Sequence, residues 1–448
     1  MKTKVLLAIT ALLATLCLLV SCGTTPTIEI SEDGYWIING EKTDVLAKGE
    51  KGEAGATENF QGLAFFLKDD NTYVVAVGYA TYLSKVEIPE TYNGKAVTEI
   101  AAHGFSGCTN LENISIPSTV TSIGGSAFNG CTKLASVTIP NGVTSIKSET
   151  FADCSSLETV SIPDSVTSIE EGAFYCCMRL AELVIPSNVV TIGNSAFGDC
   201  RSLTKITISD SVTSIGNDAF YNCTSLTTVD IGKGLTNVGT SAFKNCQRLE
   251  KIVMPDTVVK IGASAFYGCT RLASVVMGSN VRMIDNETFY NCKKLESIVI
   301  PDSVTRIGDY AFDDCANLKS VTIGNGVKAI ASCSFRNCKK LETVVFGEKV
   351  AEIGDDAFFG CMALTRITLP ESIVRIGDWA FFGCKNLTGV VIGKKLVFIG
   401  GAAFDDCKLL ADVYYSGSEE DWSKIEIYPS NDELIAATMH YNYVPENQ

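Results

Sequence analysis

The side chains of this 448-residue chain that could do chemistry are mostly cysteines and carboxylates, and their spacing does not favour catalysis. His103 and His440 are the only histidines, so a serine triad or a His-centred metal site would have to use one of them. The sequence contains no glycine-rich phosphate loop, nucleophile elbow or calcium loop. Adjacent acids such as Asp313 and Asp314 are expected on a solvated face in a chain with 51 Asp and Glu residues. We therefore expect no enzyme activity, no cofactor and no metal site.

Fourteen of the 18 cysteines recur at one fixed interval, from Cys108 to Cys407. If each repeat adds a strand to a sheet, these side chains project in parallel from positions about 4.8 Å apart. A disulfide instead needs Cβ atoms that turn toward each other at about 3.8 Å, and zinc needs a tetrahedral set of ligands. We therefore predict a row of free, buried thiols. Cys176 and Cys333 lie outside this row, and the sequence gives them no role.

A 23-residue repeat organises most of the chain. Phenylalanine recurs at thirteen consecutive intervals of 23 residues from Phe105 to Phe404, with Cys three residues later and Leu six residues later. Apolar residues spaced by three predict a 3₁₀ turn, and alternating β-branched residues predict a short strand. Polar residues three positions before the Phe, such as Asn194 and Asp309, predict caps of that turn. The expected fold is a leucine-rich-repeat-like solenoid of fourteen 23-residue units, each with a short parallel β-strand and a short 3₁₀ turn.

The unit pattern Ala-Phe-x-x-Cys-x-x-Leu, then a strand and Pro, runs for example from Ala127 to Pro140. It resembles the BspA-type leucine-rich repeats of bacterial surface proteins over about residues 60–448, but it lacks the Asn after the strand that forms the usual Asn ladder. The resemblance implies a bacterial adhesin that engages host extracellular matrix proteins or other cell-surface macromolecules. The residues alone support an extracellular binding scaffold with a protein or glycan ligand. The alternative is an envelope protein that is structural, self-assembling or glycan-binding.

The segments outside the repeats predict export and closure of the solenoid. Residues 1–21, with Lys2 and Lys4 before an uncharged apolar run, resemble a signal peptide, and Leu19-Val20-Ser21-Cys22 is similar to a lipobox with Cys22 as the lipidation site. We expect a linker with a small hairpin over 22–60, an N-terminal cap over 61–104, the solenoid over 105–411 and a C-terminal cap over 412–448. The protein would be a lipoprotein of the cell membrane or outer membrane, with its acyl chains as the membrane contact.

The candidate binding residues fall into two columns that the repeat brings to the surface. One column lies on the strands and forms an apolar stripe, and the other follows the repeating Phe and carries aromatic rings. The predicted binding residues are Val253, Val276 and Val299 in the stripe, Tyr267, Tyr290, Phe359 and Phe382 in the ring column, and Trp379 beside it. Both columns could instead serve packing, because β-branched residues suit strands and stacked rings seal neighbouring units. The formal net charge of -15 disfavours nucleic acid as a partner.

Overall fold

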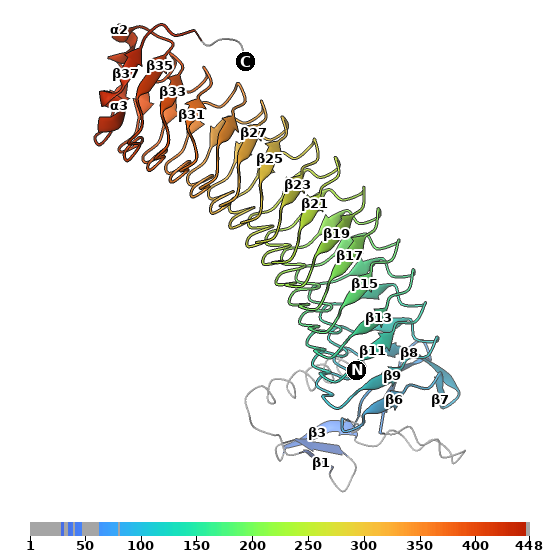
Figure 1. Ribbon diagram of the computed structural model, residues 1–448. Helices are drawn as coiled ribbons and strands as arrows, with labels where there is room; N and C mark the ends of the chain where they lie inside the picture. Colours follow the sequence, from blue (N-terminus) through green and yellow to red (C-terminus); the bar gives the residue numbers. More distant parts are fainter. Residues whose placement is uncertain (1–27, 31–34, 39–40, 47–61, 79–80, 445–448) are drawn as a thin grey trace.

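The computed structural model describes residues 28–30, 35–38, 41–46, 62–78 and 81–444. The repeats stack into a solenoid of about 16 turns, which we call rungs, and Figure 1 shows the resulting elongated rod. The predicted repeat solenoid is confirmed. Each repeat, however, supplies two short strands and not one, so two parallel strand ladders run along the rod.

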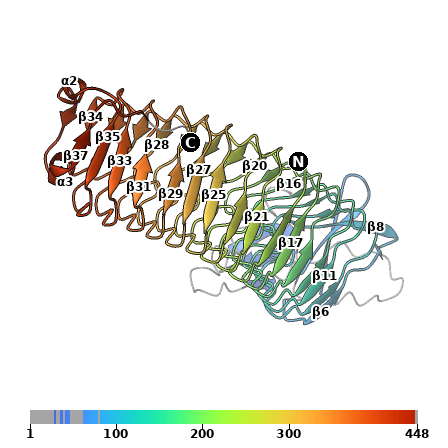
Figure 2. The same ribbon diagram turned by 45° about the horizontal axis from the view of Figure 1, so that its top comes forward.

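The first ladder contains the strand that follows the Leu of each repeat, and Figure 2 shows many of its strands side by side. Its members are β6 (Lys85–Glu87), β9 (Asn113–Ser115), β11 (Ser136–Thr138), β13 (Thr159–Ser161), β15 (Glu182–Val184), β17 (Lys205–Ile208), β19 (Thr228–Ile231), β21 (Lys251–Val253), β23 (Ser274–Val276), β25 (Ser297–Ile300), β27 (Ser320–Ile323), β29 (Thr343–Val345), β31 (Arg366–Thr368), β33 (Gly389–Ile392), β35 (Asp412–Tyr415) and β37 (Thr438–His440). Sheet hydrogen bonding is interrupted between β13 and β15, between β23 and β25, and between β29 and β31.

The second ladder contains the second strand of each repeat, which follows the first-ladder strand of the same repeat after a short connection. Its members are β8 (Lys95–Ile100), β10 (Ser122–Ile123), β12 (Ser145–Ile146), β14 (Ser168–Ile169), β16 (Thr191–Ile192), β18 (Ser214–Ile215), β20 (Asn237–Val238), β22 (Lys260–Ile261), β24 (Met283–Ile284), β26 (Arg306–Ile307), β28 (Ala329–Ile330), β30 (Glu352–Ile353), β32 (Arg375–Ile376), β34 (Phe398–Ile399) and β36 (Glu426–Ile427). From β12 to β36 it forms one sheet of 13 strands. The sequence did not predict this ladder, because a strand of two residues is too short to show an alternating pattern.

Both ends of the repeat array carry irregular elements. Near the N-terminus, β1 (Ile28–Ile30), β2 (Tyr35–Ile38) and β3 (Glu41–Leu46) form an antiparallel sheet where the sequence predicted a small hairpin. The N-terminal cap adds β4 (Ala64–Leu67), β5 (Tyr73–Ala76) and β7 (Thr91–Tyr92), and β7 pairs with β8 across a turn in which Asn93 and Gly94 both have positive φ. The C-terminal cap adds two short helices, α2 (Glu419–Trp422) and α3 (Asp432–Ala436).

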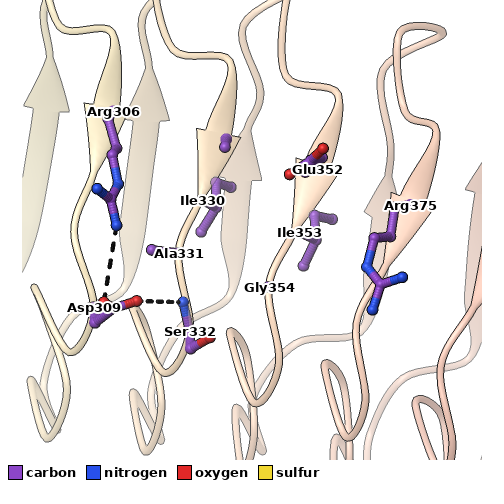
Figure 3. A pocket seen from close by; sticks show the side chains of 10 residues that line it. Arg306, Asp309, Ile330, Ala331, Ser332, Glu352, Ile353, Gly354 and Arg375 are labelled. Carbon is purple, nitrogen blue, oxygen red and sulfur yellow. Dashed lines mark hydrogen bonds and ion pairs between the residues drawn. The ribbon is translucent and has the colours of Figure 1, made fainter.

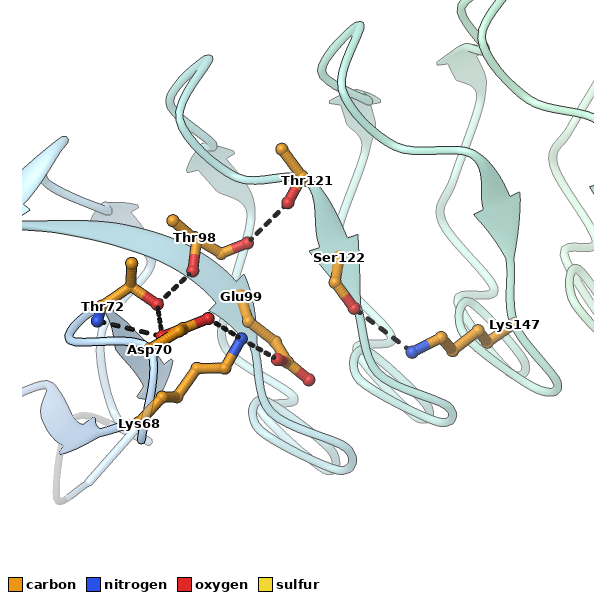
Figure 4. A network of polar contacts seen from close by, with 8 residues as sticks. All are labelled: Lys68, Asp70, Thr72, Thr98, Glu99, Thr121, Ser122 and Lys147. Atoms are coloured by element: carbon orange, nitrogen blue, oxygen red, sulfur yellow. Dashed lines mark hydrogen bonds and ion pairs between the residues drawn. The ribbon is translucent and has the colours of Figure 1, made fainter.

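Polar contacts hold the N-terminal cap against the first rungs. Lys68, beyond β4, pairs with Asp70 at 3.3 Å and with Glu99 on β8 at 3.2 Å (Figure 4). The hydroxyl of Thr98 donates to Thr72 at 2.9 Å, and Thr72 donates to Asp70 at 2.6 Å. The turn between β4 and β5 is therefore tied to the start of the second ladder.

The segment around each repeating Phe contains the predicted tight turn, but this turn is not a regular 3₁₀ helix. In one repeat, the amide of Cys131 donates to the Phe128 carbonyl three residues back, as a 3₁₀ turn requires, but the amide of Phe128 donates to Thr150 of the next rung. Ser126 and Gly130 have positive φ, which interrupts any regular helix. The apolar residues spaced by three therefore mark a turn in which hydrogen bonds within a rung alternate with hydrogen bonds between rungs.

The predicted helix caps are instead ladders between rungs. Asn194 accepts a hydrogen bond from the amide of Asn217, 23 residues later, and Asn217 accepts one from Thr240, both at 2.9 Å. The same bond recurs at Asn286, Asp309, Asp355 and Asp378. A second set of these bonds follows the first-ladder strand at Asp210, Asp256, Asp302 and Asn325. The chain thus has two interrupted Asn/Asp ladders in place of the missing Asn ladder.

The core is one continuous cluster along the rod. The fourteen repeating Phe rings are fully buried, and successive rings stack with centroids 5.1–5.5 Å apart and planes within 16°. Around this Phe spine, each repeat buries its Cys and its Leu, and most of the inward-facing apolar residues of both strands are buried as well. One rung alone could not bury these groups, so its stability depends on its two neighbours.

Candidate binding surfaces

The predicted apolar stripe lies on the outward face of the first ladder. Val253, Val276 and Val299 are on β21, β23 and β25 in consecutive rungs, and they are 45%, 48% and 65% exposed. Val253 and Val276 are register partners in the sheet. The residues two positions earlier, Lys251 and Ser274, are exposed and polar, so the stripe is one residue wide. The structure therefore brings the three valines together on an open face.

The predicted ring column forms stacked pairs. The rings of Tyr267 and Tyr290 are 4.6 Å apart and 7° from parallel, and those of Phe359 and Phe382 are 4.9 Å apart and 12° from parallel. All four side chains are half-buried. Lys244 lies over the Tyr267 ring at 4.5 Å. Because neighbouring groups cover the ring faces, the geometry of this column favours packing between rungs.

Trp379 is separate from these pairs. It is 47% exposed, has a φ of 52°, and its carbonyl accepts a hydrogen bond from the Phe382 amide. Within the described residues its ring makes no stacking contact with Phe359 or Phe382. This region therefore contains one stacked pair of rings and one separate, protruding indole. An exposed indole is available for contact with another molecule.

A buried ion pair interrupts the ring column. The side chain of Asp313 is fully buried, and its Oδ2 accepts hydrogen bonds from Arg336 at 2.6 and 3.0 Å. Its Oδ1 has no partner among the described residues. Burial raises the pKa of the Asp313 carboxyl, while the Arg336 guanidinium opposes that shift. The Arg336 guanidinium also lies 5.3 Å from the Tyr310 ring centroid, close to Cys333. Asp313 thus has a packing role, although the sequence placed it on a solvated face.

The cysteine row has the predicted arrangement. All sixteen cysteines of the described segments are free. Each repeating Cys from Cys131 to Cys407 donates its thiol to the carbonyl of the Phe in the preceding rung at 3.1–3.4 Å. Burial raises the pKa of Cys108 to about 12 and raises those of Cys177 and Cys200 well above the usual value. These thiols are therefore poor nucleophiles and poor metal ligands.

The histidines lie in different parts of the rod. His103 is in the turn after β8, and His440 is on β37, where its Nε2 lies 2.8 Å from Asp412 and its ring stacks on Tyr414 at 4.5 Å. Within the described ranges, no group of three His, Cys, Asp or Glu side chains is arranged to hold a metal ion. The positions of His103 and His440 therefore do not support a site that contains both histidines.

An open depression of about 340 Å³ lies on the second ladder (Figure 3). The small residues Ala329, Ala331 and Gly354 leave space between Arg306 and Arg375. Arg306 pairs with Asp309 at 3.8 Å, while Arg375 lies over the Phe398 ring at 4.0 Å. Because arginine and carboxylate side chains both line it, the depression could form polar contacts with another molecule at the surface.

Sequence reasoning missed the basic residues that follow the repeating cysteines. They include Arg248, Arg271, Lys294 and Lys340, each two positions after a repeating Cys, and all four are exposed. No local motif contains them, because they are 23 or 46 residues apart. An alignment of the repeats by position would have shown them as a column.

The expected lipidation site, Cys22, lies outside the described residues. Among the described residues, no helix has the length and apolar character needed to span a membrane.

Comparison with known proteins identifies the family. The BspA type Leucine rich repeat region, described with six copies, matches residues 78–204, 190–319 and 305–424. A leucine-rich repeat protein from Bacteroides ovatus is 27% identical with a TM-score of 0.63, and the match covers 85% of this chain and 98% of that chain. A leucine rich cell surface protein from Faecalibacterium prausnitzii is 29% identical with a TM-score of 0.47, over 90% and 98% of the two chains. No curated protein gives a significant match. Because the family matches extend through nearly all the rungs, the chain belongs to the BspA-type leucine-rich repeat proteins.

Proposed function

We propose that the protein is a lipid-anchored cell-surface protein and that its solenoid acts as an adhesin for extracellular macromolecules such as matrix proteins. The observation that carries the proposal is the outward face of the first ladder, which extends along the rod and exposes the valines of β21, β23 and β25. A long, open face with apolar side chains suits a large partner better than a small molecule. The BspA resemblance supports adhesion, and the lipobox-like sequence at Cys22 supports anchorage. Catalysis has no part in the proposal.

Anchorage can be tested at Cys22. The Cys22→Ala change removes the sulfur that would accept the acyl chain, so the protein should no longer enter the detergent phase or incorporate labelled fatty acid. Cys17→Ala, which changes another cysteine of the same N-terminal segment, should leave both readouts unchanged. Equal incorporation of fatty acid in the Cys22→Ala protein and the wild type would refute the anchor.

Binding can be tested with immobilised matrix proteins and the Trp379→Ala variant. If the protruding indole contacts the partner, its loss should weaken binding by about 2 kcal/mol and leave the melting temperature nearly unchanged. Phe382→Ala is the comparison, because that change removes a ring stacked on Phe359 and should lower the melting temperature. If wild-type protein at the cell surface binds none of the matrix proteins, the adhesin role is wrong for those ligands.

A further inference from the structure

A stripe of positive charge follows the turns that lead into β21 to β29. We define the basic stripe as the exposed Lys and Arg residues at the first and second positions after a repeating Cys in these rungs: Arg248, Arg271, Lys293, Lys294, Lys339 and Lys340. The rung of β27 has Ala316 and Asn317 at these positions, so the stripe has a gap of one rung. Backbone contacts keep the turns in register, because the amide of Arg271 donates to Gln247 of the previous rung at 3.2 Å. The stripe therefore runs parallel to the rod axis, with successive rungs about 4.8 Å apart.

The cations of the basic stripe form no direct ion pair with the described part of the chain. None of the six has an ion-pair partner within 4.0 Å in the part of the chain that the structure describes. A nearby carboxylate, Glu296, is already paired with Lys319 at 3.0 Å. The hydrogen bond from Lys319 lowers the pKa of Glu296, and Lys340 and Lys294 contribute in the same direction. The stripe therefore keeps free positive charge.

This local charge is opposite to the charge of the whole chain. The five segments 247–251, 270–274, 293–297, 316–320 and 339–343 contain eight Lys and Arg residues against three Glu residues, whereas the chain as a whole carries a formal charge of -15. A row of cations on an acidic protein attracts an anionic partner to that row, while the negative charge on the rest of the protein repels the partner. The partner must be narrow and must carry repeated charges to satisfy several rungs at once.

We propose that the basic stripe binds a linear anionic polysaccharide along the rod axis. Nucleic acid is the less favoured polyanion, because no aromatic residue occurs in the five segments to stack on bases. The proposal deepens the proposed function by naming the chemistry of one partner, and it rests on that function only for the partner's extracellular setting. Release of counterions from the polymer would drive binding, which must therefore weaken as salt increases.

The test measures binding of the purified full chain to dextran sulfate, with uncharged dextran as the matched polymer. Wild-type protein should bind only the sulfated polymer. The double change Lys294→Gln with Lys340→Gln should weaken that binding about tenfold and lower the slope of log Kd against log salt by about two. The matched control is Lys133→Gln with Arg179→Gln, which removes two positive charges at the same repeat position in rungs outside the stripe. This control should retain the wild-type affinity and slope.

Several results would overturn the proposal. These are no binding of dextran sulfate by the wild type, equal losses in the two double variants, or tighter binding of single-stranded polynucleotide than of the sulfated polymer. Melting temperatures of all variants distinguish lost contacts from lost folding. The test uses purified protein, so failure of the Cys22 anchor would leave this result intact, and failure here would leave the anchor and matrix-protein binding intact.

Discussion

At the residue scale, each repeating cysteine combines two roles. Its small apolar side chain fits beside the Phe spine, and its thiol donates to a Phe carbonyl in the preceding rung, at 3.2 Å for Cys246 and Phe220. Parallel projection keeps neighbouring sulfur atoms from adopting disulfide geometry. A row of cysteines in an exported protein would ordinarily indicate disulfides. Here the repeating thiols are free and buried, and they contribute to packing between rungs.

The first prediction concerns the redox state of this cysteine row. An alkylating reagent should label few repeating cysteines in the folded protein, because burial excludes the reagent and holds the thiols protonated. In denaturant without reductant, most of the fourteen should become labelled. Cys176, which is half-buried and outside the row, serves as an internal comparison and should react faster in the folded protein. Recovery of disulfide-linked peptides from successive rungs would contradict the prediction.

The second prediction concerns the buried pair of Asp313 and Arg336. Arg336→Met leaves the Asp313 carboxylate buried without a counter-charge. We expect the free energy of unfolding to fall by about 3 kcal/mol near neutral pH. This value is at the lower end for buried ion pairs, because Arg336 is 33% exposed. The pKa of Asp313 is raised in the folded state. At a pH between the pKa values of the unfolded and folded states, the folded state therefore binds more protons than the unfolded state. Stability from this group therefore rises as the pH falls through that window.

Thermal unfolding across a pH series tests this pair. The deficit of Arg336→Met relative to the wild type should shrink toward acid pH, as Asp313 becomes protonated. Arg179→Met breaks an exposed pair with Glu158 and should have little effect at any pH. A deficit in Arg336→Met that is independent of pH would show that lost packing, and not the buried charge, is responsible.

At the element scale, glycine sets how closely the second-ladder turns approach one another. A Cβ on Gly239 would lie 2.5–2.6 Å from the backbone of Gly216 and Asn217 in the preceding rung. Real Cβ atoms do not approach backbone so closely, so the rungs would have to separate. The third prediction is that Gly239→Ala destabilises the protein by about 1–3 kcal/mol.

Hydrogen exchange should locate that effect in the rungs on either side of Gly239, because each rung contacts only its neighbours. Gly401→Ala is the control, since the nearest atom to its Cβ would be 3.7 Å away, which is an ordinary contact. Equal stability of the two variants would show that the rungs adjust without cost.

How far the sequence predicts these elements depends on the distance over which each signal acts. The interval of 23 residues at the Phe positions predicted the solenoid, because a strict period can bury its apolar residues only by stacking. The second ladder was missed because strands such as Ser145–Ile146 are two residues long. The role of Asn194 was misassigned because its partner, the amide of Asn217, is remote in sequence and becomes close only in the folded rod. The basic stripe was missed for the same reason.

At the scale of the whole molecule, a solenoid must close its core at both ends. The C-terminal end does so by imitating a further rung. Ala402 donates its amide to Pro429, and the buried side chain of Asn431 accepts a hydrogen bond from the Phe404 amide at 3.0 Å and donates to the Gly400 carbonyl at 2.9 Å. In the other rungs, backbone carbonyls of the next repeat accept from the amides equivalent to those of Ala402 and Phe404, as Thr150 does for Phe128. One side chain thus replaces part of a missing repeat.

The last prediction tests this closure with Asn431→Leu, which keeps the approximate volume of the side chain but cannot hydrogen-bond. The Phe404 amide and the Gly400 carbonyl would lose their partners, at a cost of about 1–3 kcal/mol for each buried group. Because rungs depend on their neighbours, hydrogen exchange should increase in the last rungs and fall to wild-type values toward the middle of the rod. Asn386→Leu removes an exposed bond to the Met362 carbonyl and should cost less. If Asn431→Leu leaves exchange in the last rungs unchanged, the closure depends on apolar contacts such as Tyr415 with Trp422, and not on the imitated rung.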